Sequence, residues 1–127
     1  MNFKFSRKDH ELPPAIEKWD WKYHHMGIPT KEKQANEKHI PHLGMHVSGF
    51  PESPFGIEWM RFDKDSPIHP LIQEKPHLAF VVNDLDRELK KFEVLTPPGE
   101  PSDGVRVAMI KFQNLPVELM EFTKEYL

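Results

Sequence analysis

The chain of 127 residues contains no cysteine. It therefore has no disulfide bonds, no thiolate nucleophile and no cysteine ligands for zinc, so any metal ion must be bound by histidine, aspartate or glutamate. Glycine is scarce as well, with 6 glycines against 13 prolines. Many prolines and few glycines predict short elements separated by stiff turns, which favours a sheet-rich structure over a helix bundle.

The chain also lacks a strong charge of one sign and a long apolar run. It has 17 basic and 20 acidic side chains, and the two signs are interspersed. We therefore expect neither nucleic acid nor a membrane as a partner. No apolar run approaches the roughly 20 residues that span a bilayer, and residues 1–8 lack the apolar middle of a secretory signal. A single compact, cytoplasmic domain is the expectation.

One short stretch occurs twice. Residues 57–62 and 117–122 both read apolar-Glu-x-Met-x-Phe, with Glu58 in the first copy and Glu118 in the second. In a strand the Glu, Met and Phe of each copy would share one face, because side chains alternate. A carboxylate on an apolar face is costly unless it meets a cation, a donor or a metal. The repeated carboxylate therefore needs one common explanation.

The order of elements is also repeated. The second half reads as a strand at 76–82, a helix at 85–92, a short strand at 94–96, a turn region at 97–104, a strand at 105–112 and a final strand after a tight turn. The first half has strands at 21–30, 45–50 and 57–62, but its segment 31–38 has no apolar stripe and reads as an exposed loop. We therefore divide the domain into an N-terminal arm (1–19), a first module (20–73) and a second module (74–127).

Each half begins its first strand with a histidine, His25 and His77, and carries its glutamate in its last strand, Glu58 and Glu118. Either histidine alone is typical of a surface or hydrogen-bonded residue. As a repeated pair in pseudo-symmetric halves, the four side chains can converge on one point, with His24 pointing the other way. Two imidazoles and two carboxylates suit a divalent ion: nickel, zinc, cobalt, iron or manganese.

Three further histidines, His39, His42 and His46, have a spacing that would place them together on a helix. Pro41 and Gly44 interrupt any such helix, so we do not expect a metal site there.

Four motifs together resemble a known family. They are Tyr-His-His-Met-Gly-Ile at 23–28, Pro-His-Leu-Ala-Phe-Val-Val-Asn-Asp-Leu at 76–85, Ile-Glu-Trp-Met at 57–60 followed by Asp-Ser-Pro-Ile at 65–68, and Val-Glu-Leu at 117–119. In this order they resemble the vicinal oxygen chelate superfamily, which includes glyoxalases, methylmalonyl-CoA epimerases, bleomycin-resistance proteins and extradiol dioxygenases. The motifs are closest to those of the glyoxalases and epimerases.

The resemblance implies an α+β fold of two paired βαβββ modules, whose curled mixed sheet forms a cup; here the helix of the first module is missing or stunted. It implies that His25, Glu58, His77 and Glu118 bind a divalent metal ion. It further implies a lyase or isomerase that chelates vicinal oxygens of a small 2-oxo or thioester substrate and transfers a proton, with Glu118 as first choice of base and Glu58 as its partner.

Two alternatives stay open on the same fold. One is a non-catalytic protein that binds a small molecule, as resistance proteins do. The other is an extradiol-type dioxygenase, whose ligand set would be two histidines and one carboxylate with iron. Members of this fold often form homodimers, and we expect one here.

Overall fold

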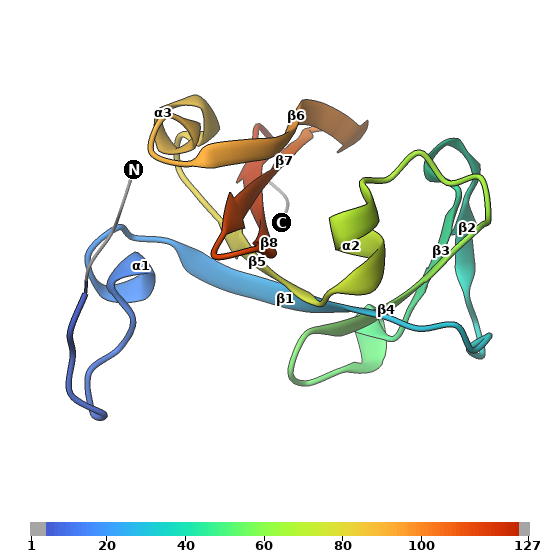
Figure 1. Cartoon of the computed structure of the whole chain (residues 1–127), viewed down its shortest axis with the longest axis horizontal. Helices are drawn as coiled ribbons and strands as arrows, with labels where there is room; N and C mark the ends of the chain where they lie inside the picture. Colours follow the sequence, from blue (N-terminus) through green and yellow to red (C-terminus); the bar gives the residue numbers. More distant parts are fainter. Residues whose placement is uncertain (1–4, 125–127) are drawn as a thin grey trace.

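A computed structural model describes residues 5–124 and shows one mixed sheet of eight strands (Figure 1). In the first half the strands are β1 (Lys22–Pro29), β2 (Lys38–Ile40), β3 (Met45–Ser48) and β4 (Ile57–Phe62). In the second half they are β5 (His77–Val81), β6 (Glu93–Ser102), β7 (Val105–Phe112) and β8 (Leu115–Phe122). The helical segments are short: α1 (Pro14–Glu17), α2 (Pro70–Glu74), α3 (Leu85–Leu89), and the 3-10 turns η1 (Pro41–Leu43) and η2 (Phe50–Glu52).

The strand order shows that the two halves are built alike. It runs β2-β3-β4-β1-β5-β8-β7-β6, so that each half repeats one arrangement outward from the centre. The first strand of each half pairs in parallel with the last, β1 with β4 and β5 with β8, and the remaining neighbours are antiparallel. The halves join through the antiparallel pair β1–β5. First strands from both halves therefore lie side by side at the middle of the sheet.

The predicted α+β fold, with a stunted first module, is confirmed. Between β1 and β2 the structure, which describes this whole segment, has no helix, whereas α3 follows β5 at the equivalent place in the second half. The α3 helix begins where expected, because the Asp84 carboxylate accepts a hydrogen bond from the Arg87 backbone N–H and so caps its first turn. It ends at Leu89, earlier than the expected 92.

Two strands differ from the sequence expectation. The three-residue β2 was not anticipated, because it is too short to show a pattern. The turn region expected at 97–104 is instead mostly a continuation of β6, which pairs with β7 through several register shifts. Prolines are tolerated there because β6 is at the edge of the sheet and because Pro97, Pro98 and Pro101 fall where its pairing with β7 shifts register.

Both faces of the second half of the sheet are apolar, because one packs against α3 and the N-terminal arm and the other lines the cup. On one face α3 and the N-terminal arm cover a buried cluster of apolar side chains: Trp21, Val82, Leu85, Ala108, Ile110 and Leu119. Trp21 also donates its indole N–H to the Glu88 carboxylate at 2.7 Å. The alternate residues of the same strands face the cup described below. No helix in the part of the chain that the structure describes is long and apolar enough to cross a membrane.

Candidate metal centre

The inward faces of the strands and α2 surround a cavity of about 570 Å³. Most of its lining is apolar: Ile40, Leu43, Met45, Val47, Phe50, Met60, Phe62, Ile68, Ile72, Pro97, Pro101, Val105, Val107, Met109, Met120 and Phe122. Among the described residues, neither lysine nor arginine lines it. Its polar side chains include a group where the two halves meet, while His42, Thr96, Glu100 and Ser102 line it elsewhere.

At that junction three predicted side chains come together. His25 on β1, His77 on β5 and Glu118 on β8 each offer one ligand atom, and these atoms all lie within 4.8 Å of one another. Nε2 of His77 is 3.1 Å from the Glu118 Oε1, and Nε2 of His25 is 3.7 Å from the same oxygen. The strand register explains the convergence, because Ala79 of β5 lies opposite both His25 and Glu118.

His77 gives the clearest indication that this site binds a ligand. It is 4% exposed, and neither ring nitrogen has a hydrogen-bond partner among the described residues. Its Nε2 is close to Glu118 but not aligned for a hydrogen bond. Because buried polar atoms are nearly always paired, an Nε2 aimed at a carboxylate and a second imidazole fits a bound cation. These residues therefore fit a divalent metal ion.

Gly27 makes room for that ring. A Cβ added to Gly27 would lie 2.3 Å from the Cε1 of His77 and 2.8 Å from each ring nitrogen. The two residues are opposite one another in the β1–β5 ladder. Glycine at this position is thus part of how His77 is placed in the site.

His24 holds His25 in orientation, contrary to the expectation that it points away. A register shift between Tyr23 and His25 interrupts the β1–β5 ladder, and both histidines line the cavity. Their Nδ1 atoms are 2.8 Å apart, so one ring donates and the other accepts. Burial and the neighbouring His25 lower the pKa of His24, which favours a neutral acceptor. Donation from His25 Nδ1 leaves its Nε2 lone pair facing Glu118, the tautomer that a metal ligand needs.

Glu58, the fourth predicted ligand, lies beside this triad rather than within it. It lines the cavity from β4 but is not among the three residues whose ligand atoms converge. Burial raises the pKa of Glu58, although the charges of His25 and His77 oppose the rise. Burial also raises the pKa of Glu118, but the close approach of the His25 and His77 side chains outweighs it and brings the pKa to about 2. The two carboxylates therefore differ in basicity.

A second group of possible ligands was missed by the sequence reasoning. His39, His46 and Asp63 also bring three ligand atoms within 4.8 Å of one another, while His42 lines the cavity instead. As expected, no α-helix aligns these histidines; the β2–β3 hairpin does, because His39 and His46 are directly opposed in it. The histidine spacing was visible in the sequence, but it indicates a cluster only when the register of the β2–β3 hairpin is known.

A curled mixed sheet of two like halves, with histidines and glutamates where the halves meet, is the arrangement that the motif resemblance implies. The predicted fold is thus confirmed.

Similar folds are found among solved structures. One is that of a hypothetical protein from Bacillus halodurans, with a TM-score of 0.64 and 17% sequence identity over 84% of this chain and 98% of that one. Another is that of methylmalonyl-CoA epimerase from Mycobacterium tuberculosis, with a TM-score of 0.58 and 19% identity over 91% of this chain and 95% of that one. Neither protein-family models nor curated protein sequences match the chain.

Proposed function

We propose that the protein is a metal-dependent isomerase or lyase that moves a proton next to a carbonyl group of a small 2-oxo or thioester substrate. The observation that supports this most strongly is His77, whose buried ring nitrogens lack hydrogen-bond partners among the described residues while Nε2 is aimed at Glu118 and His25. The similarity in fold to an epimerase is a second, weaker support. In this proposal His25, His77 and Glu118 hold a divalent ion.

The bound ion would polarise the substrate carbonyl and stabilise the negative charge that develops on its oxygen. The chain's own contribution is a base. We assign this role to Glu58, because it lies beside the triad in the apolar cup and its raised pKa makes it the better proton acceptor. Glu118, the first choice from the sequence, becomes a ligand here, since its contacts with two histidines keep it ionised.

The cavity favours a substrate whose reacting end is small and carries no charged group beyond the oxygens that bind the metal ion. Its volume of about 570 Å³ is within the usual range for small-molecule sites, roughly 300–1,000 Å³. Because the described lining has no lysine or arginine, a phosphate or carboxylate on the substrate has neither of these side chains to pair with inside. Any charged tail would therefore remain at the open side of the cup.

One observation favours a second candidate, the extradiol-type dioxygenase. The converging set of two histidines and one carboxylate, without Glu58, is the donor set of non-haem iron oxygenases. This candidate predicts iron, oxygen consumption with catechols, and no requirement for Glu58 as a proton acceptor.

The test begins with elemental analysis of the purified protein and of variants reloaded with each candidate metal. Glu118→Gln is expected to lose the ion of this site, one per chain, whereas Glu58→Gln keeps it and Glu32→Gln, an exposed control, changes nothing. Solvent deuterium incorporation into acyl-CoA epimers and methylglyoxal–thiol adducts then measures proton transfer. We expect Glu58→Gln to slow it by about 10²–10⁴-fold.

Each result separates the candidates. A full metal load in Glu118→Gln removes the proposed site. Loss of metal in Glu58→Gln makes Glu58 a fourth ligand, as the sequence resemblance implies, and removes it as the free base. If the protein binds no divalent ion and its melting temperature does not rise when one is added, the remaining candidate is a non-catalytic binding protein. Bound iron together with catechol-dependent oxygen uptake would establish the dioxygenase.

A further inference from the structure

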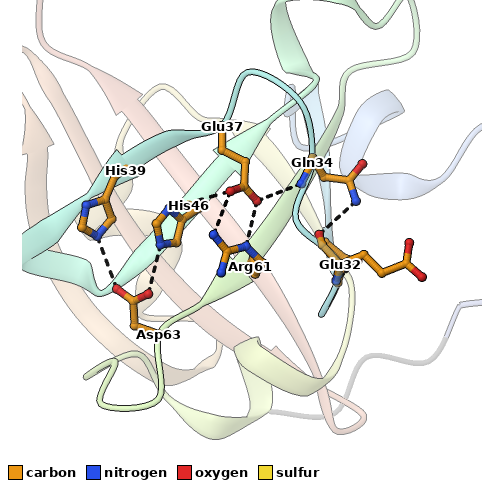
Figure 2. Close-up of polar contacts among 8 residues, drawn as sticks. Glu32, Gln34, Glu37, His39, His46, Arg61 and Asp63 are labelled. Atoms are coloured by element: carbon orange, nitrogen blue, oxygen red, sulfur yellow. Dashed lines mark hydrogen bonds and ion pairs between the residues drawn. The ribbon is translucent and has the colours of Figure 1, made fainter.

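The outer face of the first half is covered by a polar cluster instead of a helix (Figure 2). Alternation along β2, β3 and β4 turns Ile40, Met45, Val47 and Met60 into the cup. Their neighbours His39, His46 and Arg61 therefore project from the opposite face. With Asp63, which follows β4, the two histidines form a group that we term the outer histidine cluster.

The two imidazoles are held face to face by the hairpin. His39 and His46 are directly opposed in the antiparallel β2–β3 pair, an arrangement that brings side chains on one face within contact. Their rings stack with centroids 4.3 Å apart and planes 11° from parallel. Both rings direct Nε2 to the same carboxylate: His39 is 3.3 Å from Asp63 Oδ2, and His46 is 3.0 Å from Asp63 Oδ1.

Asp63 is fixed in place as the third ligand. Its backbone N–H donates to the Gly44 carbonyl at 2.8 Å, which ties the end of β4 to the β2–β3 connection. Two nitrogens and a carboxylate oxygen thus meet at one place, and all three donor atoms lie within 4.8 Å of one another.

A further carboxylate supports His46 from behind. The Glu37 side chain is 7% exposed and accepts two hydrogen bonds from Arg61, at 2.9 Å and 2.8 Å. These bonds, opposed by burial, lower the pKa of Glu37 to about 2. Its Oε1 is 3.9 Å from Nδ1 of His46, the nitrogen that faces away from Asp63 (Figure 2). At this distance Glu37 does not accept a hydrogen bond from His46, but its negative charge favours a proton on Nδ1, which leaves Nε2 free to bind a metal.

From this geometry we propose that His39, His46 and Asp63 form a second metal site, which binds zinc or a similar divalent ion on the outside of the sheet. Two imidazoles and a carboxylate suit such an ion. The His39 side chain is 49% exposed, so the ion can enter from solvent and complete its coordination with water. The site is structural: it clamps the three-residue edge strand β2 to β3 and to the end of β4.

The clamp has a consequence for the cup, because the same three strands form one of its walls. Ile40 follows His39 in the chain and Met45 precedes His46; the two residues pair with each other in the β2–β3 ladder and line the cavity. An ion that joins His39 to His46 and Asp63 therefore stabilises this wall without touching the cavity.

The experiment uses the whole chain with the inner site disabled, so that the outer site is measured alone. Metal-free His77→Gln/Glu118→Gln protein is titrated with Zn²⁺ by calorimetry, and its melting temperature is followed with and without Zn²⁺. We expect one ion per chain and a higher melting temperature with zinc. Adding His39→Gln or Asp63→Asn should weaken zinc binding by at least about 10-fold, because removing even a residue that only supports a metal ligand typically weakens binding by that much.

A matched control is available in the same hairpin. His42 lies between β2 and β3 but lines the cavity, so His42→Gln should leave zinc binding in this background unchanged. Cobalt in place of zinc gives a second readout, since its visible absorption reports imidazole ligands and should be lost in His46→Gln.

The proposal is overturned if the background protein binds no zinc, if His39→Gln and Asp63→Asn both bind it normally, or if His42→Gln weakens it equally. A variant that fails to fold is recognised by circular dichroism and replaced by its partner ligand's variant. The fate of the inner site does not affect these outcomes.

Discussion

Replacing Gly27 by alanine tests directly whether His77 is placed by the space that glycine leaves. The added Cβ would be 2.3 Å from the His77 Cε1, more than about 1 Å short of an ordinary carbon–carbon contact. Gly27 lies in a regular strand without a positive φ, so the conflict is steric and not a matter of backbone strain. His77 is 4% exposed and has little room to yield.

The magnitude follows from the cost of overpacking a buried site. We expect Gly27→Ala to reduce the free energy of unfolding by roughly 1–3 kcal/mol, which lowers the melting temperature by roughly 4–12 °C for a domain of this size. Displacing the ring should also weaken binding of a divalent ion by about 10-fold or more. Thermal unfolding of the metal-free protein measures the first effect, and calorimetric titration measures the second.

A double-mutant cycle identifies the ring as the cause. In a His77→Ala background the obstruction is gone, so Gly27→Ala should cost much less, with an interaction energy of about 0.5–3 kcal/mol. Gly99→Ala is the matched control, because its Cβ would meet nothing within 4 Å, and its effect should stay within about 0.5 kcal/mol. Equal costs of Gly27→Ala in both backgrounds would refute the reasoning.

Three further predictions concern stability. Burial raises the pKa of the Glu88 carboxyl, but hydrogen bonds with Trp21, Lys91 and Arg87 outweigh it and lower the pKa. The stabilisation by ionised Glu88 is therefore present above the unfolded pKa of about 4.5 and is lost as pH falls through the lower folded pKa. Glu88→Gln should lower the melting temperature at pH 7 and differ less from wild type in acid. Asp84→Ala should cost about 1 kcal/mol in urea unfolding, and Asp84→Ser much less. Gln113 and Asn114 both have positive φ, so Gln113→Asn/Asn114→Gly should raise the unfolding midpoint, and a fall would contradict this.

The parts of the fold that could be predicted were those with repeated patterns. The Glu-x-Met-x-Phe stretches became β4 and β8, and their glutamates both face the cup because side chains alternate. The positions of His25 and His77 followed from the same repeat. Whether each carboxylate binds an ion or only lies beside it depends on differences of about an ångström or two in position, which the sequence pattern does not predict.

The missed features depend on pairing between segments. The outer histidine cluster exists because β2 and β3 are in one register; a shift of one residue would turn His39 into the cup. Likewise Glu88 is within a charged stretch typical of an exposed helix face, yet it is 2% exposed, and Trp21, which directly precedes β1, contacts it. Neither contact leaves a periodic trace in the sequence.

The open edges of the sheet limit how this chain can associate. One edge is β6, which contains Pro97, Pro98 and Pro101 and so lacks three backbone donors; the other is β2, only three residues long. Neither offers the continuous row of N–H and C=O groups that an added strand requires. Both edges therefore disfavour end-to-end sheet polymerisation during folding, and we expect a homodimer to form through side chains on a face more readily than through shared backbone ladders.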